Sequence, residues 1–275
     1  MIMPMTRTEI FNKSLEAQQN LVAGYDTPAQ LTLIEDLLFQ EAPQTTVLRD
    51  MVLASLTSGG IKPKILESLK RDFLQVYGYN HLPLLIALEH LGLLVKQPTN
   101  IPHPFPALRK ALRLVVDDTD DTAPNDISYV YSGYAPLSIR LVQCITQKNS
   151  VLTGAVPDAD GKDGARKEVP KAHPIVGWRG FEDVLGSIPG ATVDVRQKDE
   201  QKRPHGGYCF RYQRRELIKA HGTTTTVVFF LGGCTYTEIA ALRWMAEQTK
   251  GRRFLIATTG IITGSSVRTL LTLLE

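Results

Sequence analysis

The sequence predicts a mixed fold, in which an all-helical region precedes an α/β region with an incomplete parallel sheet. Apolar residues recur at helical spacing through residues 27–116. Residues 223–275 instead follow the order strand, helix, strand, helix. Because a stable parallel sheet generally has three or more strands with both faces covered, two clear strands leave it incomplete. We place the helical region at residues 1–122 and the α/β region at 123–275.

Capping and helix-breaking residues mark the expected ends of the helices. Asp caps a first turn, Pro fits at its start, and Gly adopts the left-handed conformation that ends a helix. The expected ends lie at Asp26, Gly59, Pro63, Gly78, Asn80 and Gly92. A further helix is expected over residues 107–116.

The two helices expected at residues 63–77 and 80–91 resemble the pair of a winged helix. A second helix that reads DNA needs Arg, Lys, Asn or Gln side chains. Residues 81–91 are rich in leucine and contain no Arg or Lys. This composition favours a helical packing unit over a DNA-reading one.

The α/β region begins with a strand-like segment, Ile127–Tyr131, followed by a turn and a short helix over 137–145. Residues 148–173 are rich in Gly, Asp and Lys and poor in apolar residues, so we expect a mobile insertion. Residues 196–221 form a second expected insertion, with an excess of Arg and Lys and interleaved aromatic residues. That stretch is typical of a phosphate-binding or nucleic-acid surface, or of a solvated insertion, which we favour.

The last part of the chain predicts a β-α-β-α unit. Residues 225–231 are β-branched and aromatic without interruption, which is typical of a buried parallel strand. Thr235 and Glu238 have the spacing of a capping box at a helix start. A second strand is expected at 254–258, and a final helix from Ser265 or Ser266.

Composition and motifs exclude several functional classes. The net charge of +3 is too small to indicate a nucleic-acid partner by itself, and no apolar run has the length of a membrane span. The three cysteines are scattered, and the six histidines lack metal-ligand spacing. The chain has no GxSxG, GxGxxG or P-loop pattern. Cys234 has no identifiable base, so a buried thiol is favoured. We therefore expect no catalytic residues, no cofactor and no metal site.

Three segments carry a resemblance to the SM (Sec/Munc-type) family of SNARE regulators, and more narrowly to its vacuolar-sorting branch. The first two are DISYVYSGYAPLS at 126–138 and FFLGGCTYTEIAALR at 229–243. The third begins with GGIKPK at 59–64 and continues through Lys70–Arg71 to YGYNH at 77–81. The segments occur in the family's order.

The resemblance implies the C-terminal half of an SM protein: the later helical part of the third domain, then the return into the second, α/β domain. The chain starts directly in a helical pattern, in line with this expectation. The vacuolar branch implies a SNARE-handling subunit of the HOPS and CORVET tethering complexes, which is not an enzyme. Implied partners are the α-solenoid scaffold subunit of the class C core, and SNAREs mostly through regions upstream. The implied location is cytoplasmic, peripheral on endosome and vacuole or lysosome membranes through the complex.

The resemblance also implies that Lys70, Tyr79, His81 and Leu82 contact the scaffold subunit. Tyr and Leu in a desolvated patch with a Lys at its rim make a plausible hot spot. The alternative is that Tyr79 and Leu82 are ordinary core residues. A second functional hypothesis is a nucleic-acid module that uses the helical pair and residues 196–221. Strongly salt-dependent binding would distinguish that module from the leading hypothesis, which expects no nucleic acid.

Overall fold

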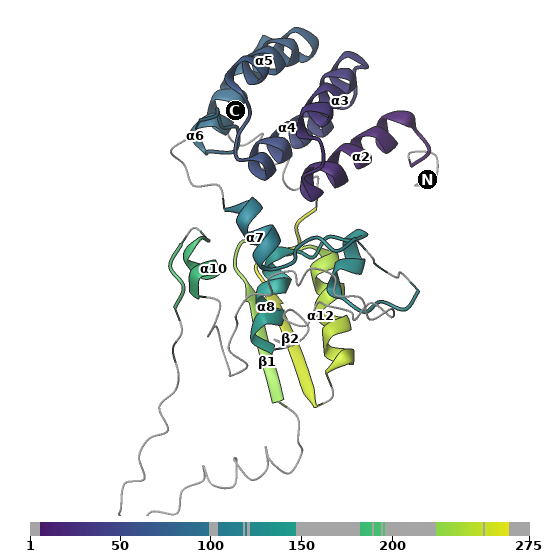
Figure 1. The fold of residues 1–275 in the computed structure, drawn as a ribbon, viewed down its shortest axis with the longest axis vertical. Helices are drawn as coiled ribbons and strands as arrows, with labels where there is room; N and C mark the ends of the chain where they lie inside the picture. Colours follow the sequence, from purple (N-terminus) through teal and green to yellow (C-terminus); the bar gives the residue numbers. More distant parts are fainter. Residues whose placement is uncertain are drawn as a thin grey trace, which may run out of the picture. The chain divides into compact units, whose positions relative to one another are not determined.

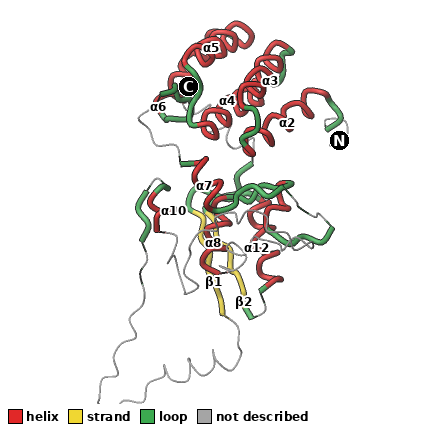
Figure 2. The backbone as a smooth tube through the Cα atoms, in the orientation of Figure 1, coloured by secondary structure: helices red, strands yellow, loops and turns green. Residues whose placement is uncertain are grey.

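The computed structural model describes residues 6–98, 104–117, 119, 122–146, 182–188, 190–193, 195, 224–249 and 251–263. The chain divides into two compact units, residues 1–110 with 263–275 and residues 111–262 (Figure 1). The first unit is helical, and the described strands belong to the second (Figure 2). The expected boundary between residues 122 and 123 stays a prediction.

The helical unit packs α2, α3 and α4 against one another and α5 against α3. Leucines that recur at helical spacing fill its core, among them Leu37, Leu66 and Leu85, which are fully buried. Its described elements are α2 (Glu9–Ala23), α3 (Thr27–Phe39), α4 (Gln44–Ser58), α5 (Pro63–Tyr77), the 3₁₀ helix η1 (Tyr79–His81), α6 (Leu82–His90) and α7 (Phe105–Ala111).

Most expected helix ends in this unit are confirmed. Asp26 caps α3 by accepting a hydrogen bond from the Ala29 N–H, and Gly59 ends α4 at φ 72°. Asn80 is not a helix cap as predicted, because it lies inside η1. α6 begins two residues later at Leu82, where a proline in the first turn favours a helix start.

The second unit packs α8, α12 and η2 around a small core that also receives one face of the sheet. Its described elements are η2 (Ile127–Tyr131), α8 (Leu137–Thr146), α10 (Glu182–Gly186), β1 (Thr224–Phe230), α12 (Tyr236–Gln248) and β2 (Arg252–Thr258). The strands β1 and β2 pair in parallel, with Val227 opposite Leu255, and α12 connects them. The β-α-β order and the Thr235–Glu238 capping box are confirmed.

Three sequence predictions in this unit are wrong. Ile127–Tyr131 is the 3₁₀ helix η2, because Asp126 accepts a hydrogen bond from the Ser128 N–H and starts a turn. The helix expected over 107–116 ends at Ala111, and Val115 instead pairs with Tyr134 in an isolated bridge. Strand β1 is not buried on both faces: the described helices cover one face, and Phe229 on the other is 61% exposed.

A buried ion pair joins η2 to α8. The Arg140 side chain is fully buried and donates to both carboxylate oxygens of Asp126, at 2.7 and 2.9 Å. It also donates to the Gln143 side chain and to the Arg113 carbonyl, both at 2.7 Å. Burial by itself raises the pKa of Asp126, but hydrogen bonds and the charge of Arg140 outweigh burial and leave that pKa below its ordinary value.

An arginine from α7 caps the C-terminal end of α2. Arg109 donates to the Val22 carbonyl at 3.3 Å, where a cation is favoured by the dipole of the helix C-terminus. The guanidinium lies directly over Gly24, which ends α2 at φ 76°. A Cβ on Gly24 would lie 2.0 Å from Arg109 Nη1. The backbone conformation therefore favours glycine at this position, and any larger residue would also displace the Arg109 guanidinium.

We expect Asp126→Asn to lower the free energy of unfolding by about 3 kcal/mol at pH 7, because it leaves the Arg140 charge buried without its counterion. The lowered pKa makes the pair fully stabilising above pH 3.8, the ordinary value, and that contribution is lost as the pH falls through the lowered pKa. Urea unfolding monitored by tryptophan fluorescence, between pH 2 and 7, measures both effects. The exposed Asp36→Asn is the control. An acid profile of Asp126→Asn that matches the unchanged chain would contradict the assignment.

We expect Gly24→Ala to destabilise the helical unit by at least about 1 kcal/mol, since alanine is strained in the left-handed region and its methyl group displaces Arg109. A double-mutant cycle with Arg109→Ala in urea unfolding separates the two causes. With Arg109 already truncated, only the backbone strain should remain. Equal effects of Gly24→Ala in both backgrounds would show that the guanidinium is not in the way.

Candidate functional site

The predicted contact residues gather where α5 meets α6 in the helical unit. Tyr79 and Leu82 lie on the surface there, 69% and 42% exposed. They are therefore not core residues, which was the alternative that the sequence left open. Tyrosine is a residue type that protein-binding hot spots favour, and the exposed Leu82 adds apolar area beside it.

The turn after α5 positions Tyr79. Gly78 ends α5 at φ 105°, a conformation that L side chains rarely adopt. A Cβ on this glycine would also lie 2.7 Å from Asn80 Oδ1. The chain then forms the single 3₁₀ turn η1, whose residues Tyr79 and Asn80 are exposed.

The two sides of α6 differ in burial. Leu84, Leu85 and Leu88 are buried in the core of the unit. Leu82 and Ile86, one turn apart on the opposite side, are 42% and 43% exposed. Ile86 therefore extends the surface formed by Tyr79 and Leu82, which we call the α6 patch. Sequence reasoning missed Ile86, although its spacing of four residues from Leu82 was the available signal.

Lys70 and His81 are less exposed than the residues of the α6 patch. The Lys70 side chain is only 13% exposed, and its Nζ is 2.9 Å from Glu89 Oε1. His81 is half-buried, with its Nδ1 3.0 Å from the Gln44 side-chain nitrogen and its ring edge-on to Phe73. The structure thus brings Tyr79 and Leu82 together on the surface and holds Lys70 and His81 in contacts within the unit.

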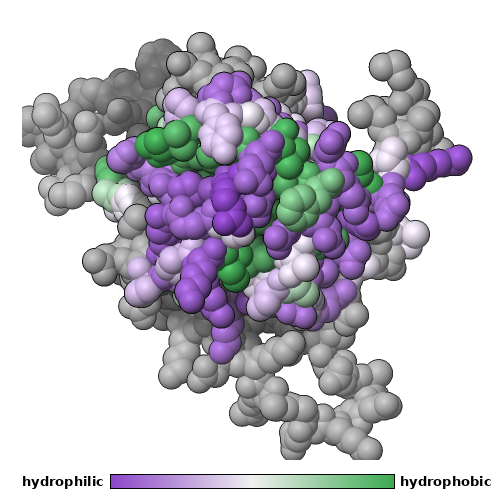
Figure 3. Space-filling model, turned by 90° about the horizontal axis from the view of Figure 1, so that it is seen from above, coloured by the Kyte–Doolittle hydropathy of each residue, from purple (hydrophilic) through white to green (hydrophobic). Residues whose placement is uncertain are grey.

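Other apolar side chains of the helical unit are exposed as well. Figure 3 shows hydrophobic side chains in separate patches among hydrophilic ones on the face seen from above. Exposed large apolar residues elsewhere in the described part of the unit are Phe11, Leu15, Tyr25, Phe39, Leu56 and Leu91. Exposure alone therefore does not single out the α6 patch, and these residues provide matched controls.

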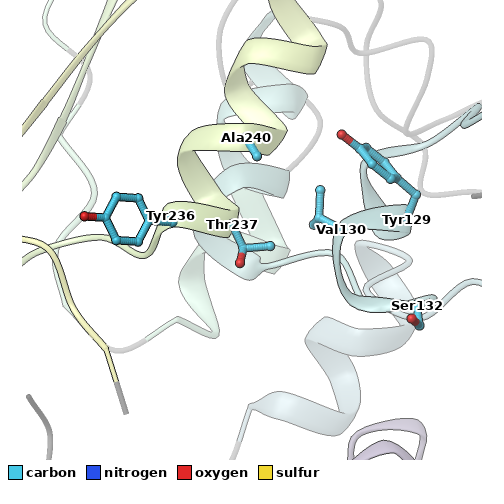
Figure 4. A pocket seen from close by; sticks show the side chains of 6 residues that line it. All are labelled: Tyr129, Val130, Ser132, Tyr236, Thr237 and Ala240. Atoms are coloured by element: carbon cyan, nitrogen blue, oxygen red, sulfur yellow. The ribbon is translucent and has the colours of Figure 1, made fainter. Parts of the chain in front are cut away.

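The segments 126–138 and 229–243 come together in the second unit. Ser138 donates to Glu238, and Tyr131 Oη lies 3.3 Å from Thr235 Oγ1. Between η2 and the first turns of α12 lies an open pocket of about 480 Å³. Side chains of Thr237 and Ala240 face η2 across it, while the Tyr236 ring points away (Figure 4). This apolar surface pocket has no arrangement of an acid, a base and a nucleophile.

Among the described residues, no group of His, Cys, Asp and Glu side chains is arranged to hold a metal ion. Cys144 and Cys234 are buried thiols. None of the helices in the described ranges has the length and apolar character needed to cross a bilayer. The two expected insertions, 148–173 and 196–221, and the expected final helix lie outside the described residues. Nothing in the described part of the chain supports a nucleic-acid interface.

Comparison with known proteins identifies the family. The family model described as "Sec1 family" matches residues 1–268. Vacuolar protein sorting-associated protein 33A of Rattus norvegicus is 38% identical over 267 residues, which are 97% of this chain. Vacuolar protein sorting-associated protein 33 of Schizosaccharomyces pombe is 33% identical over 272 residues, and the homologue of Arabidopsis thaliana is 32% identical over 269. Each of these two matches covers 95% of this chain.

These relatives are much longer than the chain. The matched region is 38% of the rat protein and 39% of each of the other two. Their names denote vacuolar protein sorting, and none denotes an enzymatic activity. The resemblance carried by the three sequence segments is confirmed, and the chain belongs to the Sec1 family.

Proposed function

We propose that the chain acts in vacuolar protein sorting as an SM protein that docks onto the α-solenoid scaffold subunit of a tethering complex. The exposure of Tyr79 and Leu82 at the α5–α6 corner is the observation that carries this proposal. A tyrosine and two aliphatic side chains on one surface provide apolar area that is desolvated when a partner helix covers it. Membership of the Sec1 family and similarity to vacuolar sorting proteins supply the biological setting.

The wider role follows from the family resemblance. The complexes concerned are HOPS and CORVET, and the chain carries no enzymatic activity in them. SNARE binding and templating, which lead to membrane fusion, belong mostly to parts of the longer relatives outside the matched region. The protein acts at the cytoplasmic side of endosome and vacuole or lysosome membranes, and reaches them through the complex.

Substitution of the α6 patch tests the docking. We expect the double variant Tyr79→Asp, Leu82→Lys to weaken binding to the C-terminal solenoid portion of the scaffold subunit at least about thirtyfold, because it places two charges in a desolvated contact. Co-elution on a sizing column and titration calorimetry with the 275-residue chain measure the loss.

The matched control is Tyr25→Asp, Phe39→Lys, which introduces the same charges at residues that are 57% and 60% exposed in the same unit. The control should bind like the unchanged chain. Equal weakening in both variants would show that the patch is not the contact. Absence of binding by the unchanged, monodisperse chain would refute the proposal.

A further inference from the structure

The Lys70 side chain is mostly buried and forms ion pairs within the helical unit. Its Nζ is 2.9 Å from Glu89 Oε1, near the C-terminal end of α6, and 3.8 Å from Glu67 Oε1 on its own helix. With 13% of the side chain exposed, little of Lys70 is available to a partner. A carboxylate of another protein would therefore compete with Glu89 and Glu67 for the three N–H donors of the Lys70 ammonium group.

A second lysine extends this ion pair into a network. Lys96 Nζ lies 2.6 Å from Glu67 Oε1 and 3.9 Å from Glu89 Oε1. Its hydrogen bond lowers the pKa of Glu67, so this carboxylate stays ionised at neutral pH. Lys96 belongs to the segment that follows α6 and pairs with Ile61, just before α5. The four charged groups therefore tie α5, α6 and the chain after α6 together.

The N-terminal end of the η1–α6 segment makes a polar contact of its own. His81 Nδ1 lies 3.0 Å from Gln44 Nε2, at the first residue of α4. Glu89 and His81 are thus polar attachments at the two ends of the stretch that presents the α6 patch. Between them, Leu84, Leu85 and Leu88 supply apolar contact, which is less directional than hydrogen bonds.

We propose that Lys70 is a positioning residue, which acts through Glu89 to fix the orientation of α6 and does not itself touch the scaffold subunit. This inference rests on the proposed function. A partner can bind the α6 patch only when Tyr79, Leu82 and Ile86 are exposed together on one surface. If loss of the ion pair lowers the population of that arrangement, the apparent affinity falls by the same factor.

A charge exchange distinguishes positioning from direct contact. We expect Lys70→Glu and Glu89→Lys each to raise the Kd for the C-terminal solenoid portion of the scaffold subunit about tenfold. Because Lys70 also neighbours Glu67 and Glu89 also neighbours Lys96, the restoring variant reverses all four charges. The fourfold exchange Glu67→Lys, Lys70→Glu, Glu89→Lys, Lys96→Glu re-forms every pair of the network and should return the Kd to within about threefold of the unchanged chain. Lys64→Glu, an exposed charge reversal on the same helix, controls for net charge and should have no effect.

Amide hydrogen exchange over residues 79–90 provides a readout that needs no partner. Hydrogen exchange should speed up in either single variant and slow again in the fourfold exchange, while circular dichroism stays unchanged. If the fourfold exchange restores the hydrogen-exchange rates but not the affinity, Lys70 contacts the scaffold itself and the inference is wrong. The inference also fails if the single variants change neither quantity. If the unchanged chain does not bind, the proposed function fails, whereas the exchange rates still decide whether the pair holds α6.

Discussion

The packing of α6 against the rest of the helical unit determines which side chains the unit offers to a partner. Leu84, Leu85 and Leu88 enter the core, and the helical repeat then leaves Leu82 and Ile86 outside. Successive residues of a helix are about 100° apart, so a rotation of α6 of that size about its axis would exchange exposed and buried positions. The turn at Gly78, the contact of His81 with Gln44 and the ion pair of Glu89 with Lys70 all oppose such a rotation. The docking that we propose for the α6 patch depends on this arrangement.

Sequence reasoning predicted those parts of the fold that depend on local chemistry. The Asp26 cap, the Gly59 terminus and the Thr235–Glu238 capping box involve residues at most four positions apart, and all are confirmed. Predictions that depended on distant neighbours were less successful. The strand-like composition of Ile127–Tyr131 was outweighed by the turn that Asp126 starts and by the fit of Ile127 and Ser128 into a core shared with α12. Local residue preference carries no information about such contacts.

In the candidate site too, features that depend on distant residues could not be predicted from the sequence. Residues 81–91 are leucine-rich, so the sequence could not tell that Leu82 is exposed while Leu84 and Leu85 are buried. The inward position of Lys70 depends on Glu89, 19 residues later in the chain. A further buried contact, in which Ser14 donates to Asp50 at 2.8 Å, joins residues 36 positions apart. Such contacts form only when the helices pack, so the sequence alone does not reveal them. They bury charged side chains that would otherwise be expected on the surface.

The half-covered sheet also bears on how the chain behaves at high concentration. Val227, Phe229 and Leu231 project from one face at 62%, 61% and 85% exposure, and Leu255 on the paired strand is 49% exposed. No proline interrupts residues 224–231, so the uncovered strip is regular. Regular apolar strands in solvent promote intermolecular association, and flanking charges oppose it. Arg253 at the start of β2 is exposed on the same side of its strand as Leu255, where its charge can act as a gatekeeper, whereas Arg252 donates to Thr226. We therefore expect self-association through this strip to depend on ionic strength, because salt screens the charge of Arg253.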